Sequence, residues 1–447
     1  NISDDGLTYT FKLRNNSHWA MFSGHKAVLG ENYEDTFDIT VKAEDFKFGI
    51  ERTLSEQTGS ADAPLFSAVK SISTPDDFTI VFNLSYADDN FLYALTNPGA
   101  MPCDEEFFNL TNGKYGLDAK YLLCNGPFHV SKWTEKTSVK LAKNNEYNGE
   151  SSVSPSSVTF YINNDDSEVA DKMNSVTYDV AFLSSSQFSS IENKKDLNSV
   201  AVQNVTYSFI FNQNDNNYRN KNMRLAFCRS CDTSSLFDSQ SDISKADGIV
   251  PPSCKIGGED YRNGNAAELL SYDETLAKKN FNDALLELGS SSVETTILCT
   301  EQYEPFVKQM VQKLQKTLGV KFVSTVKVVS ESDLEAAVND GNYSVAFYPF
   351  KAKSSFAGEI IEGFDQNNIF GYESDVLSQK IRNIKNNSGS LEGERSAVAD
   401  AENYLVSEAV IMPVFYENSY FVTSKKTSGI YFYSSADNVC FINAKKS

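Results

Sequence analysis

The chain has 447 residues, of which 40% are hydrophobic, and a formal net charge of −20 at pH 7. This length is too great for one compact core and predicts two or three lobes. The acidic balance argues against the basic face that nucleic-acid binding requires, and it is typical of an exported, soluble protein. No run of 18 apolar residues occurs, so no membrane-spanning helix is expected.

The first part of the chain shows short strand and helix patterns. Residues 8–14 alternate between apolar and polar side chains, which predicts a half-buried strand. Apolar residues at 43, 46, 50 and 54 form a stripe that predicts an amphipathic helix. A Pro-Asp-Asp turn at residues 75–77 then leads into a second alternating strand over 78–84.

Beyond Val205 the pattern changes to a regular alternation of helices and strands. A capping box at residues 271–274 opens a helix that ends at Gly289, and a helix that ends at Gly319 follows a strand over 293–299. Further strands are expected over 320–329 and 343–348, with a second capping box at 332–335 between them. Such an alternation predicts parallel strands joined by crossover helices. The change near Val205 is the best domain boundary.

The sequence lacks the usual signatures of catalysis. It contains no G-x-S-x-G, P-loop, H-E-x-x-H or dinucleotide motif, and its adjacent acidic pairs are read as solvated turns. Cys228 and Cys231 form a C-x-x-C pair inside a helix predicted over 223–237, where buried, reduced thiols are the expected state. The three histidines form no ligand cluster, so no metal site and no cofactor are expected.

Several segments together resemble one known family. They are Asp5–Arg14 with Trp19, Val41–Phe46, Asn125–Phe128 with Trp133, and Pro413–Tyr416. Their order and spacing resemble the extracellular solute-binding proteins of family 5, which are the oligopeptide- and dipeptide-binding components of ABC importers. The resemblance implies a ligand-capturing protein rather than an enzyme.

The resemblance also implies an architecture. The expected fold is α/β, of the two-lobe periplasmic-binding-protein type (cluster C), with a first lobe of residues 1–204 to which residues 415–447 return. A second lobe covers residues 205–414, and hinge crossovers lie near 200–206 and 412–415. The first lobe is expected to be truncated at its N-terminus. Cys103 and Cys124 flank a segment that this fold brings near the cleft, so they are the best-placed disulfide candidates.

In that family a permease in the membrane is the partner and a peptide or other small solute is the ligand. The chain is therefore expected to be a monomer at the cell surface, held by a lipid anchor, or periplasmic in a Gram-negative source. Two alternatives remain open. The solute could be an oligosaccharide or a metal chelate, or the chain could be a secreted hydrolase.

The resemblance points to three segments for the ligand site. Tyr207 and Phe209 lie on a strand that would enter the second lobe along the ligand, although both fit a sheet core equally well. Tyr416 ends the return crossover. The third segment runs from Val345 to Lys353.

The third segment departs from the family pattern. Peptide binders of the family carry Trp-x-x-Asp here, and the Asp pairs with the ligand's α-amino group, whereas Phe350 and Lys353 occupy these two positions in this chain. Lys351 and Lys353 therefore favour an anionic or polar group, unless Lys353 points to solvent. Asn367 and Asn368 are added as candidates, with a polar surface turn as the alternative.

Overall fold

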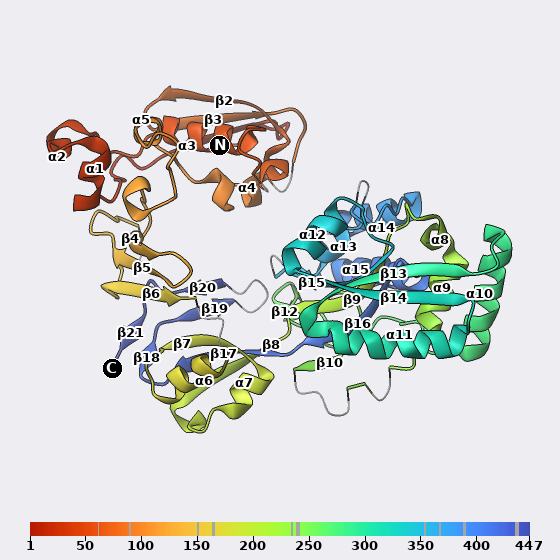
Figure 1. Ribbon diagram of the computed structural model, residues 1–447. Coiled ribbons are helices and arrows are strands. Elements are labelled where there is room, and N and C mark those ends of the chain that lie inside the picture. The colour runs from red at the N-terminus through yellow and green to blue at the C-terminus, as the bar shows by residue number, and fades with distance from the viewer. Residues whose placement is uncertain are drawn as a thin grey trace. The chain divides into compact units, whose positions relative to one another are not determined.

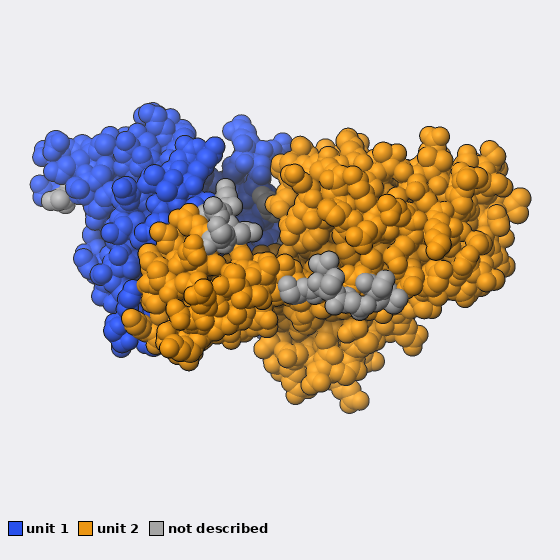
Figure 2. All heavy atoms as spheres, turned by 60° about the horizontal axis from the view of Figure 1, so that its bottom comes forward, with its two compact units in different colours: residues 1–164, 427–430, 440–447 blue, residues 165–426, 431–439 orange. Residues whose placement is uncertain are grey.

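The computed structural model describes residues 1–60, 62–88, 91–149, 152–162, 166–233, 236–237, 242–352, 355–365, 368–387, 390–433 and 438–447. By its internal contacts the chain divides into two compact units, coloured separately in Figure 2. Unit 1 comprises residues 1–164, 427–430 and 440–447, and unit 2 comprises residues 165–426 and 431–439.

Unit 1 is built on two small antiparallel sheets, with strand orders β1-β3-β2 and β4-β5-β6, and a pair of short strands, β18 and β21. Its strands are β1 (Thr8–Lys12), β2 (Val69–Asp76), β3 (Thr79–Leu84), β4 (Phe128–Thr134), β5 (Ser138–Lys143), β6 (Ser157–Tyr161), β18 (Thr427–Ser428) and β21 (Lys445–Lys446). Its helices are α1 (Lys26–Leu29), α2 (Tyr33–Thr36), α3 (Ala43–Leu54), α4 (Phe91–Ala94) and α5 (Glu105–Leu110).

The predicted strand–helix–strand pattern of unit 1 is confirmed. Tyr9 on β1 and Phe82 on β3 pair directly and are buried together with Ile50 of α3 in one core. The apolar stripe of the helix therefore lies against the apolar face of the sheet.

Unit 2 contains a six-stranded sheet with helices on both faces (Figure 1). The strand order is β10-β16-β9-β15-β13-β14, and the strands are β9 (Val205–Phe211), β10 (Ile243–Lys245), β13 (Val293–Thr300), β14 (Phe322–Val329), β15 (Val345–Lys351) and β16 (Ile411–Glu417). Strand β13 runs parallel to β14 and β15, as the helix–strand alternation predicted. Strand β9 runs antiparallel to both of its neighbours, β15 and β16.

Two apolar cores flank this sheet. One lies under α9 (Lys221–Ser230), α10 (Glu274–Leu288) and α11 (Glu304–Leu318). The other lies under α12 (Glu331–Asn339), α13 (Gly358–Glu362), α14 (Asp375–Asn386) and α15 (Leu391–Ser407). The remaining elements of unit 2 are α6 (Asp166–Asn174), α7 (Ser185–Ser190), α8 (Asn216–Arg219), β7 (Val180–Ser184), β8 (Leu197–Val202), β11 (Lys255–Ile256), β12 (Glu259–Asp260), β17 (Ser419–Ser424) and β19 (Tyr431–Tyr433), while β20 (Asn438–Cys440) ends in unit 1.

The C-terminal segment pairs with elements that precede β9 in the sequence. Strand β17 lies between β7 and β8 and is antiparallel to both. Further on, the carbonyl of Ile442 accepts a hydrogen bond from the Ser154 amide at 2.8 Å. The compact units place residues 165–204 with the large sheet, whereas the expected first lobe covers 1–204. The expected lobes and hinges stay a prediction.

The helix predicted over 223–237 is shorter than expected. Helix α9 ends at Ser230, and Cys231 is extended, with φ −104° and ψ 109°. The carbonyls of Arg229 and Ser230 accept hydrogen bonds from the Asp273 amide and the Thr317 hydroxyl, so tertiary partners satisfy the end of the helix.

Two predicted capping boxes were also displaced. Asp273 rather than Ser271 caps α10, and Ser330 rather than Ser332 caps α12. The predicted stop of α10 is confirmed, because Gly289 has the left-handed φ of 64°.

The predicted disulfide between Cys103 and Cys124 is not formed, because all seven cysteines are free thiols. The Cys103 sulfur instead accepts a hydrogen bond from Arg52 Nη1 at 3.5 Å. Burial raises the pKa of both thiols, so both are held in the neutral form.

His25 is buried in unit 1, and His129 is partly buried there. The ring of Phe22 lies 4.2 Å from that of His25 and 5.5 Å from that of His129, measured between centroids. His25 Nε2 lies 3.3 Å from the Leu122 carbonyl oxygen, and neither Nδ1 atom has a hydrogen-bond partner among the described residues. Burial lowers the pKa of His25 from 6.5 to about 4, so the folded protein keeps this ring neutral.

We expect His25 to make folding stability pH-dependent. Its pKa is lower in the folded state, so the contribution of the neutral ring to the free energy of unfolding is fully present above pH 6.5. This contribution is lost as the pH falls toward 4, and the total loss is about 3 kcal/mol. Denaturant unfolding of the native protein and His25→Gln at pH 7.5, 6, 5 and 4.5 measures this, and the variant should lose less stability on acidification.

Asp45 acts in the opposite direction, because burial raises its pKa to about 6 and its contribution is lost as the pH rises toward that value. Its effect is common to both proteins, so it cancels in their difference. Identical pH slopes for the native protein and His25→Gln would contradict the assignment.

Candidate functional site

The carboxyl ends of the parallel strands meet at one edge of the large sheet. At this edge β13 ends at Thr300, β14 at Val329 and β15 at Lys351, and the antiparallel β9 begins with Val205 paired to Lys351. Strand β16 ends at Glu417 beside the start of β9. Ligands of open α/β sheets bind outside the carboxyl ends of the strands, so this carboxyl edge is the candidate site.

Aromatic rings gather just inside the carboxyl edge. The Tyr207 ring lies 4.4 Å from Tyr303, 5.0 Å from Phe415 and 5.6 Å from Phe347, measured between centroids, and Phe306 lies 5.2 Å from Phe415. The five residues come from β9, the start of α11 and its preceding turn, β15 and β16. Tyr207 is the half-buried member on β9, whereas Phe347 and Phe415 are fully buried. Phe306 is half-buried as well, so the exposed parts of these five rings belong to Tyr207 and Phe306, and buried rings lie beneath them.

The hydroxyl groups of Tyr207 and Tyr303 form a hydrogen-bonded chain that ends at the Glu417 carboxylate. The Tyr207 hydroxyl is hydrogen-bonded to Tyr303, whose own hydroxyl donates to Glu417 Oε1 at 2.9 Å. Gln302 Nε2 donates to the same Tyr303 oxygen at 3.2 Å. Burial, reinforced by the charge of Glu417, raises the pKa of Tyr207, and burial raises that of Tyr303. Both phenols therefore stay protonated, and the only charge in this chain of groups is that of the carboxylate.

The structure places Tyr207 at the candidate site but Phe209 in the core. Phe209 is 0% exposed and packs on Phe227 and Phe347 at centroid distances of 5.3 Å and 4.9 Å. The sheet-core alternative thus describes Phe209, while Tyr207 stays a ligand candidate.

The side chain of Phe350 lies on the opposite face of the sheet from Tyr207. It is partly buried against Phe364 and Phe370, with 5.8 Å between each pair of centroids. Lys351 is exposed at the end of β15. Lys353 and Asn367 lie outside the described residues, so their roles stay predictions.

Asn368 has a structural role in its loop. Its amide nitrogen donates to the carbonyls of Phe364, Asp365 and Tyr372, and its amide oxygen accepts from the Phe370 and Tyr372 amides. These hydrogen bonds within the loop fit the alternative interpretation of Asn368, a polar turn.

Tyr416 is buried, and its hydroxyl forms hydrogen bonds with the segment that follows β10. Its hydroxyl accepts from the Asp247 amide at 3.1 Å and lies 3.4 Å from the Gly248 and Val250 carbonyls. The same segment is held by Glu402, which is 1% exposed and pairs with Arg262. A Cβ on Gly248 would overlap both members of this ion pair, so the glycine leaves room for the pair.

Main-chain groups form hydrogen bonds with both members of the Glu402–Arg262 ion pair. Oε1 of Glu402 accepts from the Ile249 and Val250 amides at 2.6 Å and 2.9 Å, and Arg262 Nε donates to the Val250 carbonyl. A buried carboxylate with this many donors is a structural group. Tyr416 therefore belongs to a buried network, and its predicted ligand contact is not carried into our proposal.

Sequence reasoning missed Tyr303 and Glu417. Tyr303 follows the carboxyl end of β13, and Glu417 is the last residue of β16, directly after the recognised Pro413–Tyr416 segment. The rule for open α/β sheets would have selected both, had the strand ends been placed first.

Metal binding and membrane insertion would each need a particular arrangement of residues. Among the described residues, no group of three or more His, Cys, Asp or Glu side chains is arranged to hold a metal ion. In the same residues, none of the helices is both long and apolar enough to cross a bilayer.

Comparison with known proteins identifies the class of fold. An oligopeptide ABC transporter substrate-binding domain from Bacillus anthracis str. Ames superposes with a TM-score of 0.77 at 19% identity, covering 100% of this chain and 89% of that one. Listeria monocytogenes OppA bound to peptide gives a TM-score of 0.75 at 21% identity, with coverages of 100% and 89%. The fold is therefore the two-lobe α/β fold of these binding proteins.

Sequence comparison then gives the family. The model described as "Bacterial extracellular solute-binding proteins, family 5 Middle" matches residues 1–370. The dipeptide-binding protein DppE of Bacillus subtilis (strain 168) is 23% identical over 452 residues, which covers 96% of this chain and 79% of that protein. The chain belongs to family 5 of the bacterial extracellular solute-binding proteins.

We expect the Tyr303 hydroxyl to matter for stability. Tyr303→Phe keeps the ring but removes the hydrogen bonds of the Tyr303 hydroxyl to Tyr207 and Glu417, at a cost of about 1–3 kcal/mol. Denaturant unfolding measures the loss. Tyr272→Phe is the matched control, because Tyr272 bonds to Glu274 at 3.4 Å while 44% exposed. An equal loss in both variants would contradict the proposed hydroxyl chain.

Proposed function

We propose that this chain is the solute-capturing component of an ABC importer and that its solute is a peptide. Family membership supports the binding role, and the relatives named above are a dipeptide-binding protein and an oligopeptide-binding protein. The carboxyl edge of the large sheet is the single structural observation that carries the proposal for this chain.

The charges at the carboxyl edge suit a peptide. Lys351 ends β15 and Glu417 ends β16, and these strands flank β9 on its two sides. The edge thus presents one positive and one negative group on either side of a half-buried tyrosine ring. A peptide carries an ammonium, a carboxylate and apolar side chains, and each of these has a counterpart at the edge.

The role is one of binding rather than turnover. A captured peptide is read through its backbone and termini, and its delivery to a permease in the membrane leaves it unchanged. We further propose that the protein acts as a monomer outside the cell, held near the permease by a lipid anchor. The segments near 200–206 and 412–415 act as the hinges of closure.

Lys353 determines whether the site binds the free α-amino group of a peptide. It stands where peptide binders of the family carry a carboxylate for the α-amino group, so the ligand's ammonium is held elsewhere, with Glu417 at the end of β16 as the candidate carboxylate. Lys353→Asp should therefore improve the binding of peptides with a free amino end relative to acetylated ones. A charge-assisted hydrogen bond corresponds to about ten- to a hundredfold in affinity.

Calorimetry tests this with matched free and N-acetylated tetrapeptides on the native protein, Lys353→Asp and Lys279→Asp. Lys279 is an exposed lysine of α10, so its variant controls for net charge. We expect the preference for free peptides to rise only in Lys353→Asp. The same preference in all three proteins would show that Lys353 is a solvated loop residue.

The same titrations separate the alternatives. Oligosaccharides and metal chelates are titrated in the same way. If one of these solutes binds and no peptide does, the ligand is that solute and not a peptide. The appearance of shortened peptides would identify a hydrolase and overturn the binding role.

A further inference from the structure

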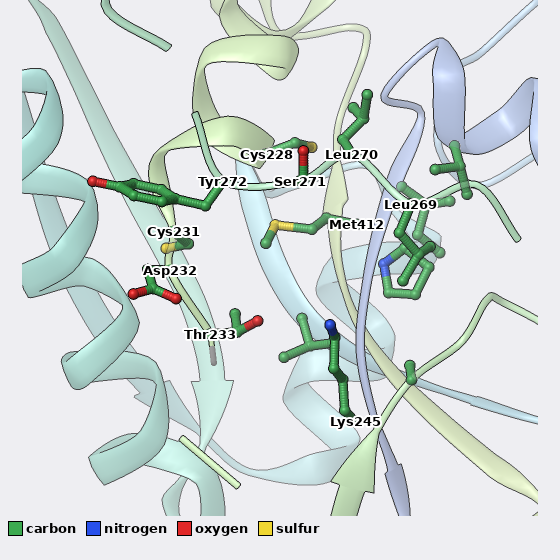
Figure 3. Close-up of a pocket in the computed structure, with 15 residues that line it drawn as sticks. Cys228, Cys231, Asp232, Thr233, Lys245, Leu269, Leu270, Ser271, Tyr272 and Met412 are labelled. Carbon is green, nitrogen blue, oxygen red and sulfur yellow. The ribbon is translucent and has the colours of Figure 1, made fainter. Parts of the chain in front are cut away.

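A cavity lies in unit 2, and none of the residues that line it belongs to the candidate site at the carboxyl edge. It has a volume of about 220 Å³ and is lined by the first half of β16, the end of α9, and residues 269–272 (Figure 3). The main chain that leaves β10 bounds it too, where the Ala246 amide donates to the Val414 carbonyl at 3.1 Å. None of Tyr207, Tyr303 and Glu417 lines the cavity, so it is distinct from the candidate peptide site.

Most of the cavity wall is apolar. Leu269, Leu270, Ile411 and Met412 are among the residues that line it, and Figure 3 shows the Met412 side chain in the middle of the space. Cys228 and Cys231 also contribute to the wall. Burial raises the pKa of both thiols to about 12, so they are neutral and act as apolar surface.

One cation faces this apolar space. Lys245, the last residue of β10, is exposed and makes no ion pair with any residue that the structure describes. In Figure 3 its ammonium group points toward the Met412 side of the cavity, while Asp232 and Tyr272 lie on the other side. The negative charge of the wall is thus separated from its positive charge, and the end near Lys245 is positive.

An apolar chamber with one positive end is complementary to a small amphiphile with one negative end. A neutral apolar ligand would leave the Lys245 charge unused, and a cationic group bound at the Lys245 end would be repelled by it. A large ligand is excluded by the volume of the cavity. A short aliphatic chain that carries a carboxylate meets all of these conditions.

We propose that this cavity binds a small aliphatic carboxylate, which pairs with Lys245 and lays its hydrocarbon chain against Met412 and Leu270. The site is separate from the carboxyl edge, so it does not rest on the peptide proposal. Occupation places a ligand on β16, the strand that continues through Glu417 at the carboxyl edge.

Hexanoate tests the proposal by methionine-methyl NMR. The chain has six methionines, and a Met412→Leu spectrum assigns the methyl signal of Met412. We expect a saturable shift of that signal on titration with hexanoate. The signal of Met101, which is 51% exposed and lies in unit 1, should not follow it. Hexylamine, which has the same chain with the opposite charge, should not compete.

Two variants separate the ion pair from the apolar contact. Lys245→Met should weaken hexanoate about fivefold, the effect of a solvent-exposed ion pair of about 1 kcal/mol. Lys327→Met is the control, because Lys327 is exposed on β14 at the opposite edge of the sheet. No saturable Met412 shift, equal binding of hexylamine, or equal affinity in Lys245→Met and the control would each overturn the proposal.

Discussion

The large sheet depends on the register of its central strand. Strand β9 is paired along its length with β15 on one side and β16 on the other, and its side chains alternate between two separate cores. Phe209 and Phe211 enter one core and Ile210 enters the other. A slip of one residue would exchange the two sets, so burial on both faces fixes the register. The same register sets Lys351 opposite Val205.

The composition of the candidate site follows from that constraint. Because β9 begins where β15 and β16 end, residues far apart in the sequence meet at one edge. Tyr207 reaches Tyr303, and Tyr303 reaches Glu417, which lies 114 positions further along the chain. The rigid core beneath them holds the phenol and the carboxylate in place before a ligand arrives, which lowers the entropy cost of binding.

Much of the fold was predictable from local patterns. The strand over residues 8–14, the helix stripe from residue 43 and the parallel strands after β9 were all predicted, because each rests on a periodicity that the tertiary structure then buries. The failures have tertiary causes. Helix α9 ends early because Asp273 and Thr317 supply donors to its last carbonyls, and those donors are 44 and 87 positions away from Arg229 and Ser230.

The site was less predictable than the fold. Tyr207 and Phe209 share one face of β9, and nothing local to the strand distinguishes the half-buried residue from the fully buried one. The difference comes from the neighbouring elements, because Phe209 packs on Phe227 of α9 whereas Tyr207 packs on Tyr303 at the start of α11. Likewise, the full hydrogen bonding of Asn368 depends on a loop whose path the sequence does not specify. Sequence patterns identify the strands that form an edge, whereas neighbouring elements decide which side chains remain available there.

Native mass spectrometry tests the central claim most directly. The full chain would be incubated with a library of short peptides of mixed sequence, and the complex would be isolated and then dissociated in the gas phase. The account predicts one peptide per chain, released with its mass unchanged. A chain that retains no peptide, or that releases shortened peptides, would contradict the conclusion that this protein captures intact peptides.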